Sequence, residues 1–179
     1  MSTSGTSVRR KDPTEQATGA PVMGRRSLAL LRIAIGFLWI QNADWKIPPS
    51  FDALLHFTKD AVEYPVFPPY AWLVQHLVLP NFVFFGWGVL LLEAALGGFL
   101  LVGLATRFWA LLGIAQTVAI SLSVLYAPNE WHWSYLLMLL AHIVIVGTAA
   151  GRYAGIDGLL RPSWQASTRR FGQLLARAS

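Results

Sequence analysis

The sequence predicts an all-α integral membrane protein built as a bundle of four transmembrane helices. Of its 179 residues, 55% are hydrophobic and only 13% are charged, about half the charge of an average soluble domain. Apolar runs of about 17 to 25 residues, the length that crosses the hydrocarbon core, recur along the chain. We expect one membrane domain at 25–160, a flexible cytoplasmic tail at 1–24, and a basic cytoplasmic tail at 161–179 that is amphipathic or disordered.

Four segments have the length and composition of spans. They run from about Ser27 to Trp45, Asn81 to Gly103, Arg107 to Tyr126 and Trp131 to Ala150. The first two are joined by a loop of about 35 residues that contains two short amphipathic stretches, SFDALLHFTKDAVEY and YAWLVQHLVL. Prolines interrupt both stretches and neither is long enough to span, so we expect short interfacial or re-entrant helices in this loop.

Basic residues gather at the two ends of the chain. Five precede the first span and five follow the last, whereas the long loop carries only two. The positive-inside rule therefore predicts that both termini are cytoplasmic and that the long loop is outside. The expected location is the cytoplasmic membrane of a bacterium or archaeon. The membrane accounts for the net charge of +5, so lipid rather than nucleic acid is the expected partner. The oligomeric state is left open.

The chain has no cysteine. This excludes disulfides, thiol redox chemistry and any metal or cluster ligated by cysteine within this chain. The histidines lack metal-ligand spacing, and no flavin or haem motif is present, so no metal site is predicted. A redox function would therefore have to use a bound small molecule or a partner subunit.

Each predicted span carries one strongly polar residue at depth: Arg32, Glu93, Gln116 and His142. An ionised side chain at mid-helix costs about 2.5 to 3.5 kcal/mol on insertion scales, so we expect Arg32 and Glu93 to pair inside the bundle. Structural alternatives stay open. Arg32 would then reach the inner headgroups, Glu93 would form a purely structural ion pair, Gln116 would join helices, and His142 would pack as a neutral ring.

Helical spacing aligns further residues with these groups. Trp39 and Lys46 share a face with Arg32, while Trp131 and Tyr135 share a face with His142. Gly36 and Gly97 lie beside the charged residues and would allow close helix contact. The pattern predicts a polar core that opens outward into an aromatic cleft, although aromatic residues at span ends such as Trp131 also fit an interfacial belt.

Three stretches carry a family resemblance. They are LLRIAIGFLW with a following lysine, PNFVFFGWGVLLLEAALGGFLLVGLATR, and WSYLLMLLAHIVIVGTAAGRYAGIDGLL. The most specific parts are Glu93, Gly97-Gly98, Gly103, Thr106-Arg107, Gly151-Arg152 and Gly155-Ile156-Asp157. From about Leu28 to Leu160 the chain resembles the DoxX/DoxD family of small four-helix membrane proteins. Its long loop is similar to that of the DoxD type, the membrane subunit of thiosulfate:quinone oxidoreductase.

The resemblance implies a quinone-linked redox function, with thiosulfate or a related sulfur compound as electron donor and a second redox subunit as partner. It supplies no assigned catalytic residues, so the roles rest on residue chemistry. We expect Glu93, Arg32 and His142 as the catalytic set, Trp39, Gln116, Trp131 and Tyr135 as the quinone site, and Lys46 at the substrate entry. The alternatives are a small proton-coupled transporter and a membrane scaffold for soluble redox enzymes.

Overall fold

The computed structural model describes residues 22–179, and helices without any strand make up the fold of that part of the chain. The all-α class is therefore confirmed, while most of the predicted tail at 1–24 lies outside the described residues. Four long helices dominate: α1 (Val22–Asp44), α4 (Phe82–Val102), α5 (Thr106–Val124) and α6 (His132–Thr148). They coincide with the four predicted segments, except that α1 begins five residues before Ser27.

Two helical stretches are long and apolar enough to cross a membrane, Pro68–Val102 and Thr106–Val124. The helix α6 is apolar but has only 17 residues. The helix α1 has 23 residues and contains three arginines, which lower its mean hydropathy. Length and composition alone thus identify two spans rather than the four predicted.

The segment between α1 and α4 differs from a loop with two separate short helices. After α2 (Asp52–Glu63), the elements α3 (Pro68–Leu73), η2 (Val74–Val78), η3 (Leu79–Asn81) and α4 follow one another without a break. Pro80 lacks the N–H that a regular helix would bond. The local π and 3₁₀ turns of η2 and η3 accommodate it, so the helix continues where the sequence predicted an end.

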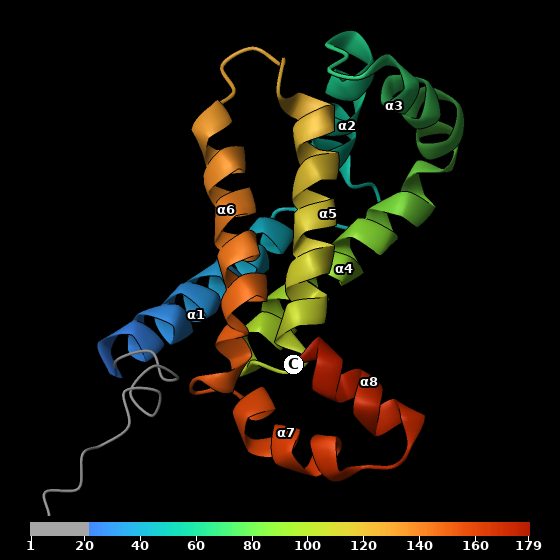
Figure 1. Cartoon of the computed structure of the whole chain (residues 1–179). Coiled ribbons are helices and arrows are strands. Elements are labelled where there is room, and N and C mark those ends of the chain that lie inside the picture. The colour runs from blue at the N-terminus through green and yellow to red at the C-terminus, as the bar shows by residue number, and fades with distance from the viewer. Residues whose placement is uncertain (1–21) are drawn as a thin grey trace, which may run out of the picture.

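The long helices form two closely packed pairs, α1 with α4 and α5 with α6 (Figure 1). Gly36 and Gly97 form the crossing of the first pair. A Cβ on Gly36 would lie 2.8 Å from the Leu101 nitrogen, and a Cβ on Gly97 would lie 2.9 Å from the Gly36 oxygen. The backbones therefore touch without intervening side chains, as the glycine positions predicted. The buried core around this crossing includes Ile35, Trp39, Leu96, Leu100, Ala110, Ile145 and Ala150.

The bundle has two different ends (Figure 1). At one end α2 and α3 lie beside the first turns of α4 and the last turns of α5. At the other end the chain leaves α6 through η4 (Ala150–Arg152) and forms α7 (Ile156–Ala166) and α8 (Arg170–Ala178). Leu159, Phe171 and Leu174 on these two helices are 79%, 70% and 60% exposed. Their apolar faces are therefore available to a membrane surface.

Candidate functional site

A buried ion pair joins Lys46 and Glu93. Lys46 Nζ lies 2.5 Å from Glu93 Oε2, and the two residues are 3% and 0% exposed. Lys46 follows the end of α1, and its backbone N–H is bonded to the Ala43 carbonyl, so its side chain turns back along the bundle toward α4. It is the only ion pair found between side chains of residues 22–179. Glu93 is thus paired, but with the residue that the sequence placed at the substrate entry.

Amide groups complete the surroundings of this pair. Gln116 on α5 donates to Glu93 Oε1 at 3.1 Å, and the Asn42 side chain lies near the same carboxylate. Lys46 Nζ donates to the Asn42 carbonyl at 2.5 Å and lies 4.1 Å from the centre of the Trp45 ring. Both carboxylate oxygens and the ammonium therefore have partners, which a charge pair removed from water requires. We call these four residues, Asn42, Lys46, Glu93 and Gln116, the charge cluster.

The predicted Arg32–Glu93 pairing is wrong. Arg32 donates instead to the carbonyls of Leu100 at 2.9 Å, Leu101 at 3.1 Å and Ala154 at 2.9 Å. Leu100 lies two helical turns beyond Glu93, at the end of α4 where carbonyls have no partner within the helix. A cation there also meets the negative end of the helix dipole. Arg32 is 0% exposed, so the alternative in which it reaches the inner headgroups does not describe it either.

Asp157 binds the other side of the same turn. Its carboxylate accepts the N–H groups of Ala105 at 2.7 Å and Thr106 at 2.9 Å, at the start of α5, and its own N–H donates to Gly103 at 2.8 Å. An anion at a helix start satisfies free N–H groups and the helix dipole together. Arg32 therefore binds the carbonyls at the end of α4, and Asp157 binds the N–H groups at the start of α5. Together they hold the turn between the two helices.

Glycines make this arrangement possible. Gly103 has a φ of 70°, the left-handed region that glycine adopts without strain. A Cβ on Gly151 would collide with the side chains of Thr106 and Asp157, and one on Gly155 would lie 3.2 Å from the Gly103 Cα. The residues that carry the family resemblance near Gly103 and Asp157 thus meet at one structural junction.

Trp39 and His142 are bonded to each other. Trp39 Nε1 donates to His142 Nε2 at 2.9 Å, and His142 Nδ1 lies 2.7 Å from the Met138 carbonyl. The Met138 carbonyl can only accept, so Nδ1 carries a proton, and the Trp39 N–H can only donate, so Nε2 is unprotonated and the ring is neutral. The ring also packs directly against Gly113. Both ring nitrogens are therefore hydrogen-bonded within the protein, which matches the alternative of His142 as a neutral packing residue.

The structure does not bring the proposed quinone-site residues together. Trp39 is 1% exposed, whereas Trp131 is 66% exposed at the start of α6. Tyr135 donates its hydroxyl to Glu130, and only Gln116 of the four reaches the charge cluster. A flat slot needs aromatic faces around a shared space. These residues therefore do not fit a quinone headgroup at the predicted position.

Among residues 22–179, no group of three His, Asp or Glu side chains is placed to hold a metal ion. Sequence reasoning missed Asn42 and Asp157 as site-forming residues. Asn42 stands four residues before Lys46, a spacing that puts both on one face, and this signal was available. Asp157 belongs to the most specific part of the family resemblance, but nothing in the sequence placed it against α5.

Comparison of the chain with models of known families, with curated proteins and with solved structures gave no match in any of the three.

Proposed function

We propose that this chain is a four-span protein of the DoxX/DoxD kind in the cytoplasmic membrane of a bacterium or archaeon, with both termini cytoplasmic. In this proposal it is the membrane subunit of a quinone-linked oxidoreductase that takes electrons from thiosulfate or a related sulfur compound. Its own contribution is proton handling by the charge cluster. The observation that carries the proposal is the buried Lys46–Glu93 pair.

The exposed face of α1 supports a span although the whole helix is not strongly apolar. Arg32 is fully buried and bonded to carbonyls, while Leu30, Phe37 and Leu38 are 67%, 54% and 51% exposed. Along this stretch, the side chains that face the lipid would therefore all be apolar. The helix α6 measures about 26 Å at 1.5 Å per residue, close to the roughly 30 Å of a bilayer core. Exposed Trp131 and Trp133 at its start suit the membrane interface.

The charge cluster supports proton handling because its groups differ in what they can exchange. Gln116 and Asn42 only orient the carboxylate, whereas Lys46 and Glu93 are able to lose or gain a proton. Ionisable groups buried within a membrane bundle are expensive and mark proton relays and substrate sites. Reduction or oxidation of a quinone requires protons to move with electrons. A buried pair of ionisable side chains could donate and accept these protons.

The junction of Arg32, Gly103 and Asp157 supports the family proposal. The two most specific parts of the resemblance are about 50 residues apart in sequence, and their contacts give both a common structural reason. The aromatic residues do not fit a quinone in this chain, so the proposal assigns quinone binding to the contact with the partner subunit and derives no step through it.

The test is thiosulfate-dependent quinone reduction in proteoliposomes that contain the chain with its candidate partner subunit. Glu93→Gln should lower the rate at least tenfold, whereas Asp44→Asn, which alters an exposed carboxylate two residues from Lys46, should not. Absence of activity for every partner tried, together with cells carrying Glu93→Gln that still oxidise thiosulfate normally, would remove the oxidoreductase proposal.

A proton-coupled transporter is the second candidate, favoured by the same pair because both of its members are sealed from solvent. Vesicles without a redox partner distinguish it. Solute flux that depends on a proton gradient and is lost in Glu93→Gln, with no quinone reduction in the coupled assay, would favour this candidate over the first.

A further inference from the structure

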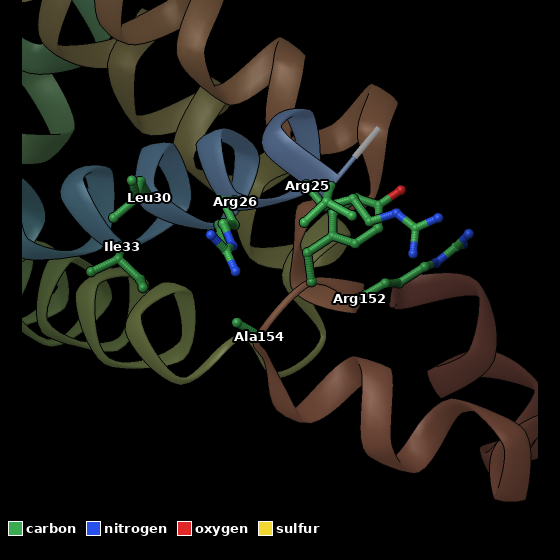
Figure 2. A pocket seen from close by; sticks show the side chains of 9 residues that line it. Arg25, Arg26, Leu30, Ile33, Arg152 and Ala154 are labelled. Atoms are coloured by element: carbon green, nitrogen blue, oxygen red, sulfur yellow. The ribbon is translucent and has the colours of Figure 1, made fainter. Parts of the chain in front are cut away.

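A basic groove lies at the α7 end of the bundle, away from the charge cluster. It has a volume of about 550 Å³ and lies between the first turns of α1 and the segment that follows η4. Its lining includes Arg25, Arg26 and Arg152 together with Leu30 and Ile33. Figure 2 shows Arg25 and Arg152 toward one end of the groove, Leu30 and Ile33 toward the other, and Arg26 between them.

The groove carries only positive charge. Among the described residues that line it, three are arginines and none is acidic. Burial lowers the pKa of Arg152, and the neighbouring Arg161 and Arg107 lower it further, against a smaller opposite effect of Tyr153 and Asp157. Within the described residues the Arg152 guanidinium makes one long hydrogen bond, 3.3 Å to the Ser179 carbonyl. An anion at this end would be attracted by the guanidinium groups that line the groove and could accept charge-assisted hydrogen bonds from Arg152.

The apolar end of the groove indicates which anion fits. Arg26 and Leu30 are four residues apart on α1, and Ile33 follows three residues later, so all three lie on one face. Leu30 and Ile33 are 67% and 38% exposed although they are large aliphatic side chains. The step from charge to apolar surface spans about 10 Å, the order of headgroup followed by acyl chain in a phospholipid. Free phosphate would leave this half of the groove uncovered.

A second groove of about 460 Å³ shares Arg152 and Ala154 with the first. Its other lining residues include the aliphatic side chains of Val102, Ile156 and Leu159. Aliphatic side chains thus line both grooves that meet at Arg152. An acyl chain of a lipid bound there could occupy either groove.

We propose that this double groove is a binding site for an anionic phospholipid, with the headgroup phosphate at Arg25, Arg26 and Arg152 and the acyl chains along α1 and α7. The site rests on the membrane placement of α1 in the proposed function but not on the redox activity. Basic pockets between helices on the cytoplasmic side are suited to anionic headgroups. The bound lipid would join α1 to η4, next to the Ala154 carbonyl that Arg32 holds.

The test is lipid binding by the full chain in a neutral detergent, followed by native mass spectrometry. Phosphatidylglycerol should bind at least tenfold more tightly than phosphatidylcholine with the same acyl chains. The variant Arg25→Gln/Arg26→Gln/Arg152→Gln should lose about a hundredfold, since each arginine contributes about fivefold near a charged lipid surface. The control Arg169→Gln/Arg170→Gln/Arg177→Gln removes the same charge from α8 and the residue before it, and should change binding less than twofold.

A separate arm identifies the source of the phosphate. Glycerophosphoglycerol, which lacks acyl chains, and inorganic phosphate should not compete with the lipid at millimolar concentration. Competition by either, equal binding of the two lipids, or equal losses in the groove and α8 variants would each overturn the site. These readouts need no redox partner, so failure of the lipid site and failure of the oxidoreductase proposal are distinguishable.

Discussion

Removing the two charges of the Lys46–Glu93 pair singly and together should separate its structural contribution from its chemistry. At 2.5 Å and an effective dielectric constant of about 20, the two charges attract by roughly 7 kcal/mol before desolvation is subtracted. Breaking a buried pair on one side leaves an uncompensated charge and costs about 3 to 5 kcal/mol. We therefore expect Lys46→Met and Glu93→Gln each to lower the free energy of unfolding by that amount.

The double variant Lys46→Met/Glu93→Gln leaves no buried charge. Its free energy of unfolding should return to within about 1 kcal/mol of the wild type, because replacing a buried pair by uncharged groups of similar volume is often neutral. Unfolding in mixed micelles can be followed by tryptophan fluorescence, since Trp45 lies 4.1 Å from Lys46 Nζ. Lys59→Met changes an exposed lysine on α2 and should have little effect.

The activity of the stable double variant then decides the role of the pair. If Lys46 and Glu93 handle protons, the double variant is stable but at least tenfold slower in quinone reduction. A double variant that regains both stability and activity would show that the pair only holds α1 against α4. Single variants as stable as the wild type would refute the premise that both groups are charged and desolvated.

Three further predictions concern the rest of the fold. Gly97→Ala should cost about 1 to 3 kcal/mol because its Cβ would lie 2.9 Å from the α1 backbone, whereas Gly98→Ala meets nothing within 4 Å and should be neutral or stabilising in the same micelle titration. Asp157→Asn removes the anion and one acceptor from the start of α5 and should cost about 1 to 2 kcal/mol; an unchanged unfolding midpoint would contradict this. Burial raises the pKa of Asp60, so the wild type should lose stability as pH rises above about 4, and Asp60→Asn should be the more stable protein at pH 7 but not at pH 3; unfolding measured at both values checks this.

The sequence predicted α4, α5 and α6 well because each is a long apolar run with clear ends. The starts of α4, α5 and α6 lie within one residue of the predicted segments. The close approach of α1 and α4 also followed from Gly36 and Gly97, since only glycine removes the side chain from a crossing. The continuity of α3 with α4 was missed because Pro80 is a valid helix breaker by local rules. Packing and a local change of helix type override that rule here.

The pairing of charges could not be predicted from depth alone. Arg32 and Glu93 both lie in long helices, and mutual attraction is the simplest way to offset the cost of burial. That reasoning overlooked a competing acceptor, the unpaired carbonyls where α4 ends. It also placed Lys46 at the substrate entry and not beside Glu93, although a lysine side chain is long enough to return to Glu93.

The two buried cations of α1 and its end therefore serve different purposes. Lys46 stands 14 residues after Arg32, about 20 Å along a helix axis. Every recorded bond of Arg32 satisfies a backbone carbonyl that the fold leaves open, so the helix ends themselves require a cation there. Within residues 22–179, Glu93 accepts no hydrogen bond from the backbone N–H groups of a helix end. It and Lys46 chiefly neutralise each other's charge. Since we expect uncharged side chains to replace this pair with little loss of stability, the charge cluster is the first place to test for chemistry in this chain.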